Sequence, residues 1–212
     1  FILEWKKLLR LRSTVCQPKV CAMSFGFFKA LIQAPTTVGA IWPSSPWLAK
    51  AMVSTSSIHS ALSVVELGPG TGAFTGHILE SLAPGAQFTA IEKSPDLARS
   101  VSRKFPNARI IEGCATDLQN HLDSENIPRP NAILSGLPWA VFDQTLQCSI
   151  LDQIHGALVE GGIFTTFAYY GPHRLRSGQR FRANLERIFK NVQRTPVVMQ
   201  NFPPAFIYYC RR

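Results

Sequence analysis

The chain has 212 residues, of which 46% are apolar and 17% are charged, and its formal net charge is +9. This length and this balance are typical of a globular chain that buries a real core, and they exclude a disordered chain. No run in the sequence reaches the roughly 18–20 consecutive apolar residues of a membrane span, which excludes a membrane-spanning helix within it.

The first twelve residues are predicted to form an amphipathic helix whose apolar and basic side chains lie on opposite sides at helical spacing. The apolar set is Phe1, Ile2, Trp5, Leu8 and Leu9, and the basic set is Lys6, Lys7 and Arg10. Such a helix favours a membrane interface, although docking on the protein's own core is an open alternative. Residues 25–32 are predicted to form a second apolar helix, which could lie at the membrane interface or pack on the protein's own core. We expect residues 1–46 to be a membrane-facing extension that includes a cofactor-closing segment, and residues 47–212 to be the main domain.

Two Ser-Pro pairs predict the starts of helices, because serine is a good N-cap and proline suits the first helical position. Ser45-Pro46 begins a helix that runs to Met52 and a little beyond. Ser94-Pro95 begins another that runs to about Phe105.

The stretch 64–72, Val-Val-Glu-Leu-Gly-Pro-Gly-Thr-Gly, reads as a buried strand followed by a glycine turn. Apolar residues at helical spacing from Phe74 to Leu82 predict a helix directly after it. Residues 86–92 form a second strand that ends in Glu92. A carboxylate there suits ribose hydroxyls. Glu66 at the tip of the first strand would repel a pyrophosphate but suits the ammonium group of an amino-acid moiety.

The rest of the chain continues the alternation of strands and helices. The expected strands are 109–112, 131–134, 163–169, 197–199 and 206–209, and the expected helices are 144–158 and the basic segment 177–189. Such spacing predicts an α/β sheet with helices on both faces. The last two expected strands are close together in the sequence, as in a hairpin, which indicates that the sheet ends in an antiparallel pair.

The glycine turn with its two strand-end acids resembles the class I S-adenosylmethionine-dependent methyltransferases. The resemblance implies a Rossmann-like sheet of seven mostly parallel strands, the last one antiparallel, with S-adenosylmethionine as cofactor and S-adenosylhomocysteine as product. It assigns cofactor binding to Gly39, Glu66, Gly68, Gly70, Gly72, Glu92, Lys93, Cys114, Ala115, Asp117 and Ser135. Cys114 departs from the aspartate that is common in the family, so the adenine contact falls to the Ala115 backbone or to Asp117. The five cysteines lack metal-ligand spacing, so reduced thiols and no metal site are expected.

The segment Ser135-Gly136-Leu137-Pro138-Trp139 resembles the amine-binding motif of amino-group methyltransferases. Two families share that plan, the bacterial rRNA adenine N6-dimethyltransferases and the bacterial phospholipid N-methyltransferases. Three features favour the second: the Val-Gly-Ala-Ile-Trp-Pro-Ser-Ser segment at 38–45, the Asn-Phe-Pro-Pro-Ala-Phe-Ile-Tyr segment at 201–208, and the expectation that no helical RNA-binding domain follows.

The resemblance implies stepwise N-methylation of phosphatidylethanolamine toward phosphatidylcholine. The candidate catalytic residues are Leu137, Pro138, Trp139, Tyr169, Tyr170, His173 and Arg174. The aromatic rings would hold the headgroup cation and the arginine its phosphate, with core packing and a solvated face as the alternatives. His173 or a tyrosine could accept the amine proton, and direct loss to water is equally open.

Charge is unevenly placed along the chain: +6 over residues 1–50, −5 over 51–169 and +8 over 170–212. Basic ends favour a polyanionic partner, either anionic lipid or nucleic acid, over mere solubility. We expect a cytoplasmic monomer bound peripherally to the inner face of the cell membrane, with nucleic acid an unlikely partner. An rRNA adenine methyltransferase and a lipid-binding protein without turnover are the competing functions.

Overall fold

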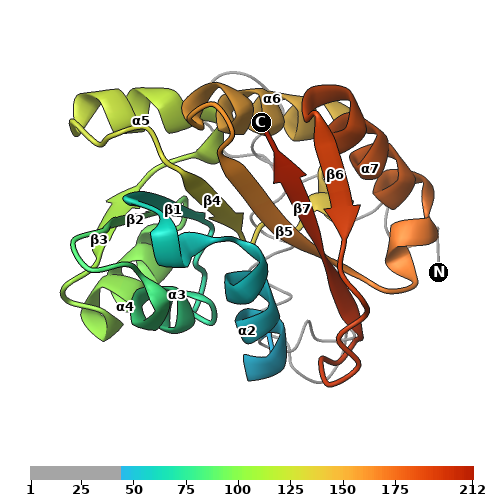
Figure 1. Ribbon diagram of the computed structural model, residues 1–212, viewed down its shortest axis with the longest axis horizontal. Helices are drawn as coiled ribbons and strands as arrows, with labels where there is room; N and C mark the ends of the chain where they lie inside the picture. The colour runs from blue at the N-terminus through green and yellow to red at the C-terminus, as the bar shows by residue number, and fades with distance from the viewer. Residues whose placement is uncertain (1–43) are drawn as a thin grey trace. The chain divides into compact units, whose positions relative to one another are not determined.

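The computed structural model describes residues 44–212, all of which belong to one unit, Trp42–Arg212 (Figure 1). The helices expected at 1–12 and 25–32 lie outside the described residues. So does most of the segment 38–45, including Gly39.

Seven strands form one sheet in the order β3-β2-β1-β4-β5-β7-β6. Neighbours from β3 to β5 are parallel, and β7 runs antiparallel to both β5 and β6. This confirms the Rossmann-like methyltransferase sheet with an antiparallel last strand. The strands are β1 Ser63–Leu67, β2 Gln87–Glu92, β3 Arg109–Glu112, β4 Ala132–Ser135, β5 Ile163–Tyr169, β6 Asn191–Arg194 and β7 Ala205–Arg211.

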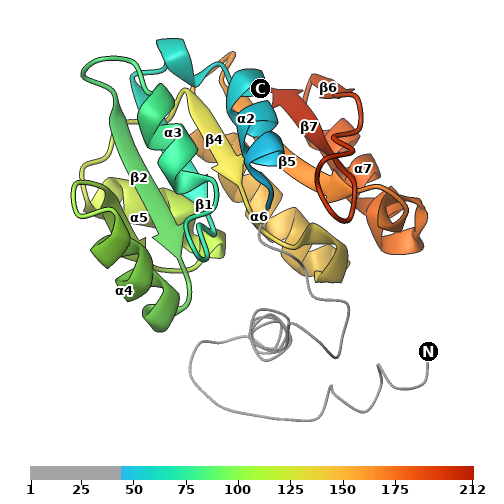
Figure 2. The same cartoon turned by 90° about the horizontal axis from the view of Figure 1, so that it is seen from below.

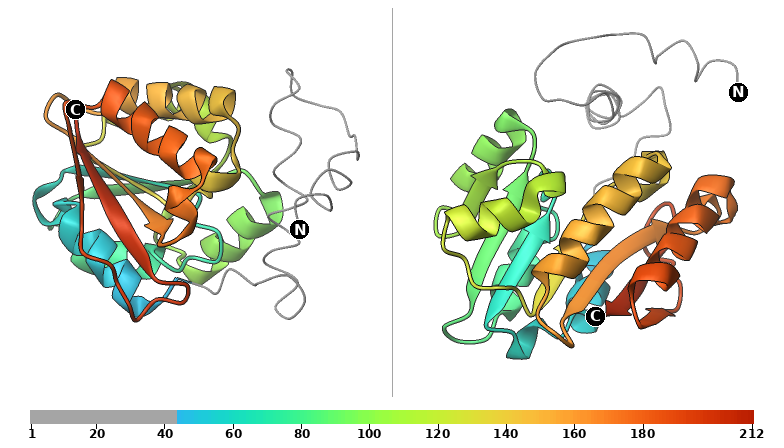
Figure 3. Two further views of the ribbon diagram at one scale, coloured as in Figure 1. Left: turned by 90° about the vertical axis from the view of Figure 1, so that its right-hand side faces the viewer. Right: turned by 90° about the horizontal axis from the view of Figure 1, so that it is seen from above.

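Helices cover both faces of the sheet, with α2, α3 and α4 on one side and α5, α6 and α7 on the other (Figures 1 and 3). The α-helices are α2 Pro46–Thr55, α3 Thr75–Ser81, α4 Pro95–Lys104, α5 Leu118–Ser124, α6 Gln144–Ala157 and α7 Arg176–Ile188. Short 3₁₀ turns are η3 Ile58–Ser60, η4 Ala115–Asp117, η5 Trp139–Val141 and η6 Pro172–Arg174. Leu48 and Met52 of α2 are fully buried in the same core cluster as Ile207 of β7.

The helix starts follow the expected capping chemistry. The hydroxyl of Ser45 accepts a hydrogen bond from the backbone N–H of Leu48 at 3.2 Å, and Ser94 does the same for Leu97 at 3.4 Å. Each serine satisfies one of the backbone donors that a helix start leaves without an intrahelical partner.

The prediction of a strand at residues 197–199 is wrong. The partner of β7 is β6, and Val198 makes only an isolated bridge to Ala205. Pro196 lacks a backbone donor and so cannot extend β6 by regular pairing. The sequence pattern does not predict β6, because this edge strand is mostly exposed and polar, nor does it predict the short helix α5.

Candidate functional site

The sheet reverses its order between β1 and β4, and ligands of open α/β sheets bind beyond the carboxyl ends of strands at such a point. The register brings these ends together. Leu67 of β1 pairs with Ile91 on one side and with Ser135 on the other, and Ser135 pairs with Thr166 of β5. The predicted cofactor and amine segments therefore leave the same edge of the sheet.

The glycine turn after β1 lies directly against the loop after β4. Gly68, Gly70 and Gly72 all have positive φ, at 69°, 59° and 78°, which favours glycine at each position. A Cβ on Gly136 would lie 2.7 Å from the carbonyl oxygen of Gly68. The close approach of these two loops thus requires glycine at position 136.

Glu66 is fully buried at the end of β1. Its Oε2 accepts a hydrogen bond from the hydroxyl of Thr75 at 2.7 Å, while its Oε1 has no partner among the described residues. Burial raises the pKa of Glu66 to about 8, the Thr75 hydrogen bond opposes the rise, and repulsion by Glu92 adds to it. A buried carboxylate oxygen without a partner is a site for an incoming donor or cation.

Glu92 ends β2 beside the same turn. Its Oε2 accepts from the backbone N–H of Gly70 at 3.1 Å and its Oε1 from that of Ser94 at 2.8 Å. Burial raises its pKa, and the hydrogen bonds from Ser94, Gly70 and Lys93 oppose that rise. The carboxylate is therefore oriented by backbone donors on both sides, while the side chain of Lys93 is exposed.

The segment after β3 holds the remaining predicted cofactor residues. Cys114 and Ala115 are partly buried and Asp117 is exposed. The Thr116 hydroxyl donates to the Cys114 sulfur at 3.0 Å. Glu112 pairs with Glu92 in the register, so this segment begins one strand away from the Glu92 carboxylate.

Ser135 and Trp139 frame the loop after β4. The backbone N–H of Leu137 donates to the Ser135 hydroxyl at 3.2 Å, and that of Trp139 donates to the Leu137 carbonyl at 3.0 Å. Leu137 and Pro138 are partly buried, whereas Trp139 is only 3% exposed. The loop is thus folded back on itself over the end of β4.

The Trp139 ring packs inward. It stacks on Phe181 of α7, with centroids 4.7 Å apart, and its indole N–H donates to Thr166 at 2.9 Å. Its carbonyl accepts from the Gln147 amide at 2.8 Å, and the Gln147 carbonyl oxygen accepts from Asn184 at 3.1 Å. No local sequence pattern identifies Thr166, Gln147 or Asn184, because their roles depend on packing between distant elements. Thr75, which contacts Glu66, was also missed, although it begins the helix after the glycine turn.

Tyr169 is the last residue of β5, and Tyr170 to Arg174 follow the strand. Tyr169 is partly buried, with no partner for its hydroxyl among the described residues, and burial raises its pKa to about 12. Tyr170 is exposed, and the Arg174 guanidinium lies 5.5 Å from its ring centre and donates to its hydroxyl at 3.3 Å. The His173 Nδ1 accepts from the backbone N–H of Gly171 at 3.1 Å. Burial lowers the pKa of His173.

These features fit S-adenosylmethionine. The glycine turn admits a ligand close to the backbone, the unpartnered Glu66 oxygen suits its ammonium group, and the oriented Glu92 carboxylate suits ribose hydroxyls. When bound, this cofactor supplies an electrophilic methyl group on a sulfonium. No cluster of three or more potential metal ligands occurs among residues 44–212.

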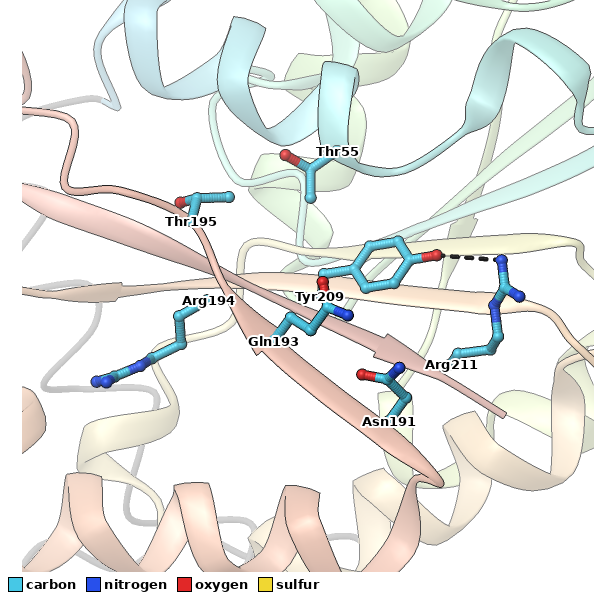
Figure 4. A pocket seen from close by; sticks show the side chains of 7 residues that line it. All are labelled: Thr55, Asn191, Gln193, Arg194, Thr195, Tyr209 and Arg211. Carbon is cyan, nitrogen blue, oxygen red and sulfur yellow. Dashed lines mark hydrogen bonds between the residues drawn. The ribbon is translucent and has the colours of Figure 1, made fainter.

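A separate hollow of about 450 Å³ lies at the β6–β7 edge, lined by Thr55, Asn191, Gln193, Arg194, Thr195, Tyr209 and Arg211 (Figure 4). Arg194 points away from the other labelled side chains, while Arg211 donates to the Tyr209 hydroxyl at 3.5 Å. None of the predicted site residues lines this hollow, which includes the last residue of α2 and the start of β6. It is therefore distinct from the strand-end site.

Solved structures with low sequence identity share the fold. The N-methyltransferase NodS from Bradyrhizobium japonicum matches 79% of this chain and 97% of its own at a TM-score of 0.62 and 14% identity. An O-methyltransferase from Bacillus cereus, solved with S-adenosylhomocysteine, matches the whole of both chains at a TM-score of 0.61 and 16% identity.

Sequence comparisons identify the family within this fold. Residues 39–129 match the model of the ribosomal RNA adenine dimethylases. Ribosomal RNA small subunit methyltransferase A of Chlorobaculum parvum is 35% identical, over 49% of this chain and 36% of its own. An ornithine lipid N-methyltransferase of Singulisphaera acidiphila is 30% identical over 88% of this chain and 95% of its own. The chain therefore belongs to the class I S-adenosylmethionine-dependent N-methyltransferases, in the family of the ornithine lipid enzyme and related to the ribosomal RNA adenine dimethylases.

Proposed function

We propose that the protein transfers methyl groups from S-adenosylmethionine to the primary amine of a membrane lipid. The observation that carries this proposal is the match along 95% of an ornithine lipid N-methyltransferase, against 36% of the rRNA enzyme of Chlorobaculum parvum. The loop from Ser135 to Trp139, which resembles an amine-binding motif, leaves the same strand edge as Glu66, in support of this reading.

Two lipid headgroups are candidates. Phosphatidylethanolamine is favoured by the resemblance of residues 38–45 and 201–208 to phospholipid enzymes, and by Arg174 as a phosphate ligand. An ornithine lipid is favoured by the name of the relative from Singulisphaera acidiphila, and its headgroup offers a primary amine without a phosphodiester. Both headgroups carry an anion that the Arg174 guanidinium could bind, so the two are distinguished by offering each lipid to the enzyme separately.

In the proposed reaction, backbone carbonyl groups of the loop after β4 position the substrate amine. The carbonyls of Leu137 and Pro138 each accept one backbone hydrogen bond, from Trp139 and Val141. A carbonyl oxygen has two lone pairs, so each retains capacity for the substrate amine. Methyl transfer is an in-line displacement, and its rate depends mainly on holding nitrogen, methyl and sulfur in line.

The amine proton leaves to water in our proposal, because both side-chain candidates are poor bases. The His173 Nδ1 accepts a backbone hydrogen bond, so in the neutral ring the proton sits on the other nitrogen. The pKa of Tyr169 is raised to about 12 by burial, so its phenol stays protonated near neutral pH. A sulfonium bound at this site would lower the pKa of the substrate ammonium and so favour the loss of its proton.

An rRNA adenine methyltransferase is the second candidate, since residues 39–129 match the dimethylase model. The third candidate is a lipid-binding protein without turnover.

Purified protein with S-adenosylmethionine tritiated in the methyl group would be offered phosphatidylethanolamine vesicles, ornithine lipid vesicles or ribosomal RNA, separately. We expect label in a lipid, whereas label in RNA or in none of the three rejects the proposal.

The role of Arg174 is tested by comparing the wild type with Arg174→Ala on phosphatidylethanolamine. If Arg174 binds the phosphate, the variant loses about tenfold or more in kcat/KM, the equivalent of about 1.4 kcal/mol. Its affinity for S-adenosylhomocysteine should stay near that of the wild type. An unchanged kcat/KM would remove Arg174 from phosphate recognition.

A further inference from the structure

The exposed large apolar side chains are concentrated at one edge of the fold. Within residues 44–212 seven such side chains are exposed, and six lie where the strands β4 and β5 end or in segments that adjoin those ends. The six are Trp47, Val141, Tyr170, Leu175, Met199 and Phe202. The seventh, Leu62, precedes β1 and so lies at the opposite edge of the sheet. Exposed apolar groups gathered on one side indicate an interaction surface.

Hydrogen bonds join three of the segments that carry these side chains, which are all of them except the segment of Val141. The backbone N–H of Ser45, next to the start of α2, donates to the buried side chain of Asn201 at 2.9 Å. The backbone N–H of Tyr170 donates to the Pro204 carbonyl at 2.7 Å. The start of α2 thus lies beside the loop between β6 and β7, as Figures 1 and 2 show. Three segments distant in sequence form one connected surface.

Cationic groups are interspersed with the apolar ones. Lys50 Nζ lies 5.8 Å from the centre of the Trp47 ring, Arg174 lies over Tyr170, and Arg176 is exposed at the start of α7. The segments 45–50, 170–176 and 195–204 contain no Asp or Glu. The surface is therefore both apolar and positive, which is complementary to an anionic lipid interface.

We propose that this surface, the docking face, inserts into the headgroup region of an anionic phospholipid bilayer. In this position the methyl-transfer site faces its lipid substrate. The inference rests on the proposed lipid N-methyltransferase function and names the surface that delivers the substrate. Leu175 and Phe202, which are 62% and 79% exposed, are the residues that enter the acyl boundary. Tyr170 and Trp47 lie at headgroup depth beside their cations. A surface for RNA phosphates would need the cations but not the exposed Leu, Met and Phe tips.

Insertion is tested directly in the full chain by tryptophan fluorescence with lipids brominated in their acyl chains. Leu175→Trp places a reporter on the docking face, and Leu62→Trp places a matched reporter on the opposite edge. The emission of the tryptophan at position 175, taken as the difference from the parent protein, should be quenched by vesicles of brominated phosphatidylglycerol. The emission of the tryptophan at position 62, taken in the same way, should not be quenched. Absence of quenching at position 175 overturns the proposal. A response to ribosomal RNA without quenching by lipid also overturns it, and would identify an RNA surface.

A binding measurement complements the insertion measurement. Leu175→Asp/Met199→Asp should weaken sedimentation with phosphatidylglycerol vesicles at least tenfold, while Leu62→Asp should bind as the wild type does. Both variants should keep the melting temperature and affinity for S-adenosylhomocysteine of the wild type. Vesicle binding by the double variant equal to that of the wild type contradicts the proposal.

A soluble substrate separates this inference from the proposed function. A short-chain amino lipid below its critical micelle concentration needs no bilayer, so the double variant should methylate it at the wild-type rate. If the wild type methylates neither soluble nor vesicular lipid, the proposed function fails. If the wild type methylates both the soluble and the vesicular lipid, and the double variant does so at the same rates, the docking face is rejected while the proposed function stands.

Discussion

The indole nitrogen of Trp139 donates a hydrogen bond to the hydroxyl of Thr166 at 2.9 Å, and this hydroxyl donates in turn to the carbonyl of Ser135 at 3.1 Å. One threonine on β5 thereby fixes both ends of the loop that resembles an amine-binding motif. All three residues are buried, so the two bonds do not exchange freely with water. The geometry of the loop is set by the neighbouring strand.

Thr166→Val should destabilise the fold and slow methyl transfer. It leaves the buried indole N–H without its acceptor, which costs about 1–3 kcal/mol of the free energy of unfolding. Thr165→Val is the matched control, because the Thr165 hydroxyl is also buried but has no partner among the described residues. Urea unfolding and kcat should show the loss for position 166 and little change for position 165. Equal effects would contradict the role given to Thr166.

Binding of the cofactor at pH 7 should release a proton from Glu66. Its pKa is raised to about 8 by burial, so the carboxyl is largely protonated at pH 7 in the ligand-free protein. An ammonium group beside it favours the carboxylate, so affinity should rise with pH toward 8 and then level. Calorimetry in phosphate and in Tris buffer should give different apparent binding enthalpies at pH 7. For Glu66→Gln the difference should shrink, and an unchanged difference would exclude Glu66 as the proton source.

Gly136→Ala should weaken cofactor binding and methyl transfer together. The added Cβ would lie 2.7 Å from the Gly68 carbonyl oxygen, so the loops after β1 and β4 must separate. We expect at least a tenfold loss in affinity for S-adenosylhomocysteine, which corresponds to about 1.4 kcal/mol. Gly76→Ala is the control, since its Cβ would make an ordinary 3.5 Å contact with Phe105. Wild-type affinity in Gly136→Ala would show that the two loops tolerate separation.

Gln147→Leu should lower kcat with a smaller effect on KM for lipid. Gln147 is fully buried and links the Trp139 carbonyl to Asn184 of α7, so it positions the loop without reaching the substrate. Gln153→Leu on the same helix is the comparison, because Gln153 accepts from the backbone of Gln119 instead. A variant at 147 with wild-type kcat and reduced stability would leave Gln147 with a structural role alone.

The sequence predicts much of the fold because local signals agree with it. Ser45 and Ser94 each stand before a proline at a helix start, and both cap those helices in the structure. The glycines after β1 predict the turn that the positive φ angles require. The strand β6 escapes prediction because an exposed edge strand needs no apolar alternation, and its identity comes from pairing with β7.

The candidate site is predictable only where residues act next to their own strand. Glu66 and Glu92 fall at strand tips, so their position follows from the sequence pattern. The inward packing of Trp139 on Phe181 depends on how α7 lies over the sheet, which no local pattern encodes. Gln147 and Asn184 are polar positions that resemble a solvated helix face until α6 and α7 are brought together.

Locating the transferred methyl group on the lipid tests the proposed lipid N-methylation. Purified protein would be incubated with trideuteromethyl S-adenosylmethionine and vesicles that contain phosphatidylethanolamine or ornithine lipid, and the lipid would be fragmented by tandem mass spectrometry. We predict deuterated methyl groups on the headgroup amine nitrogen. Lipid that remains free of label, or label on an oxygen of the headgroup, would contradict the account.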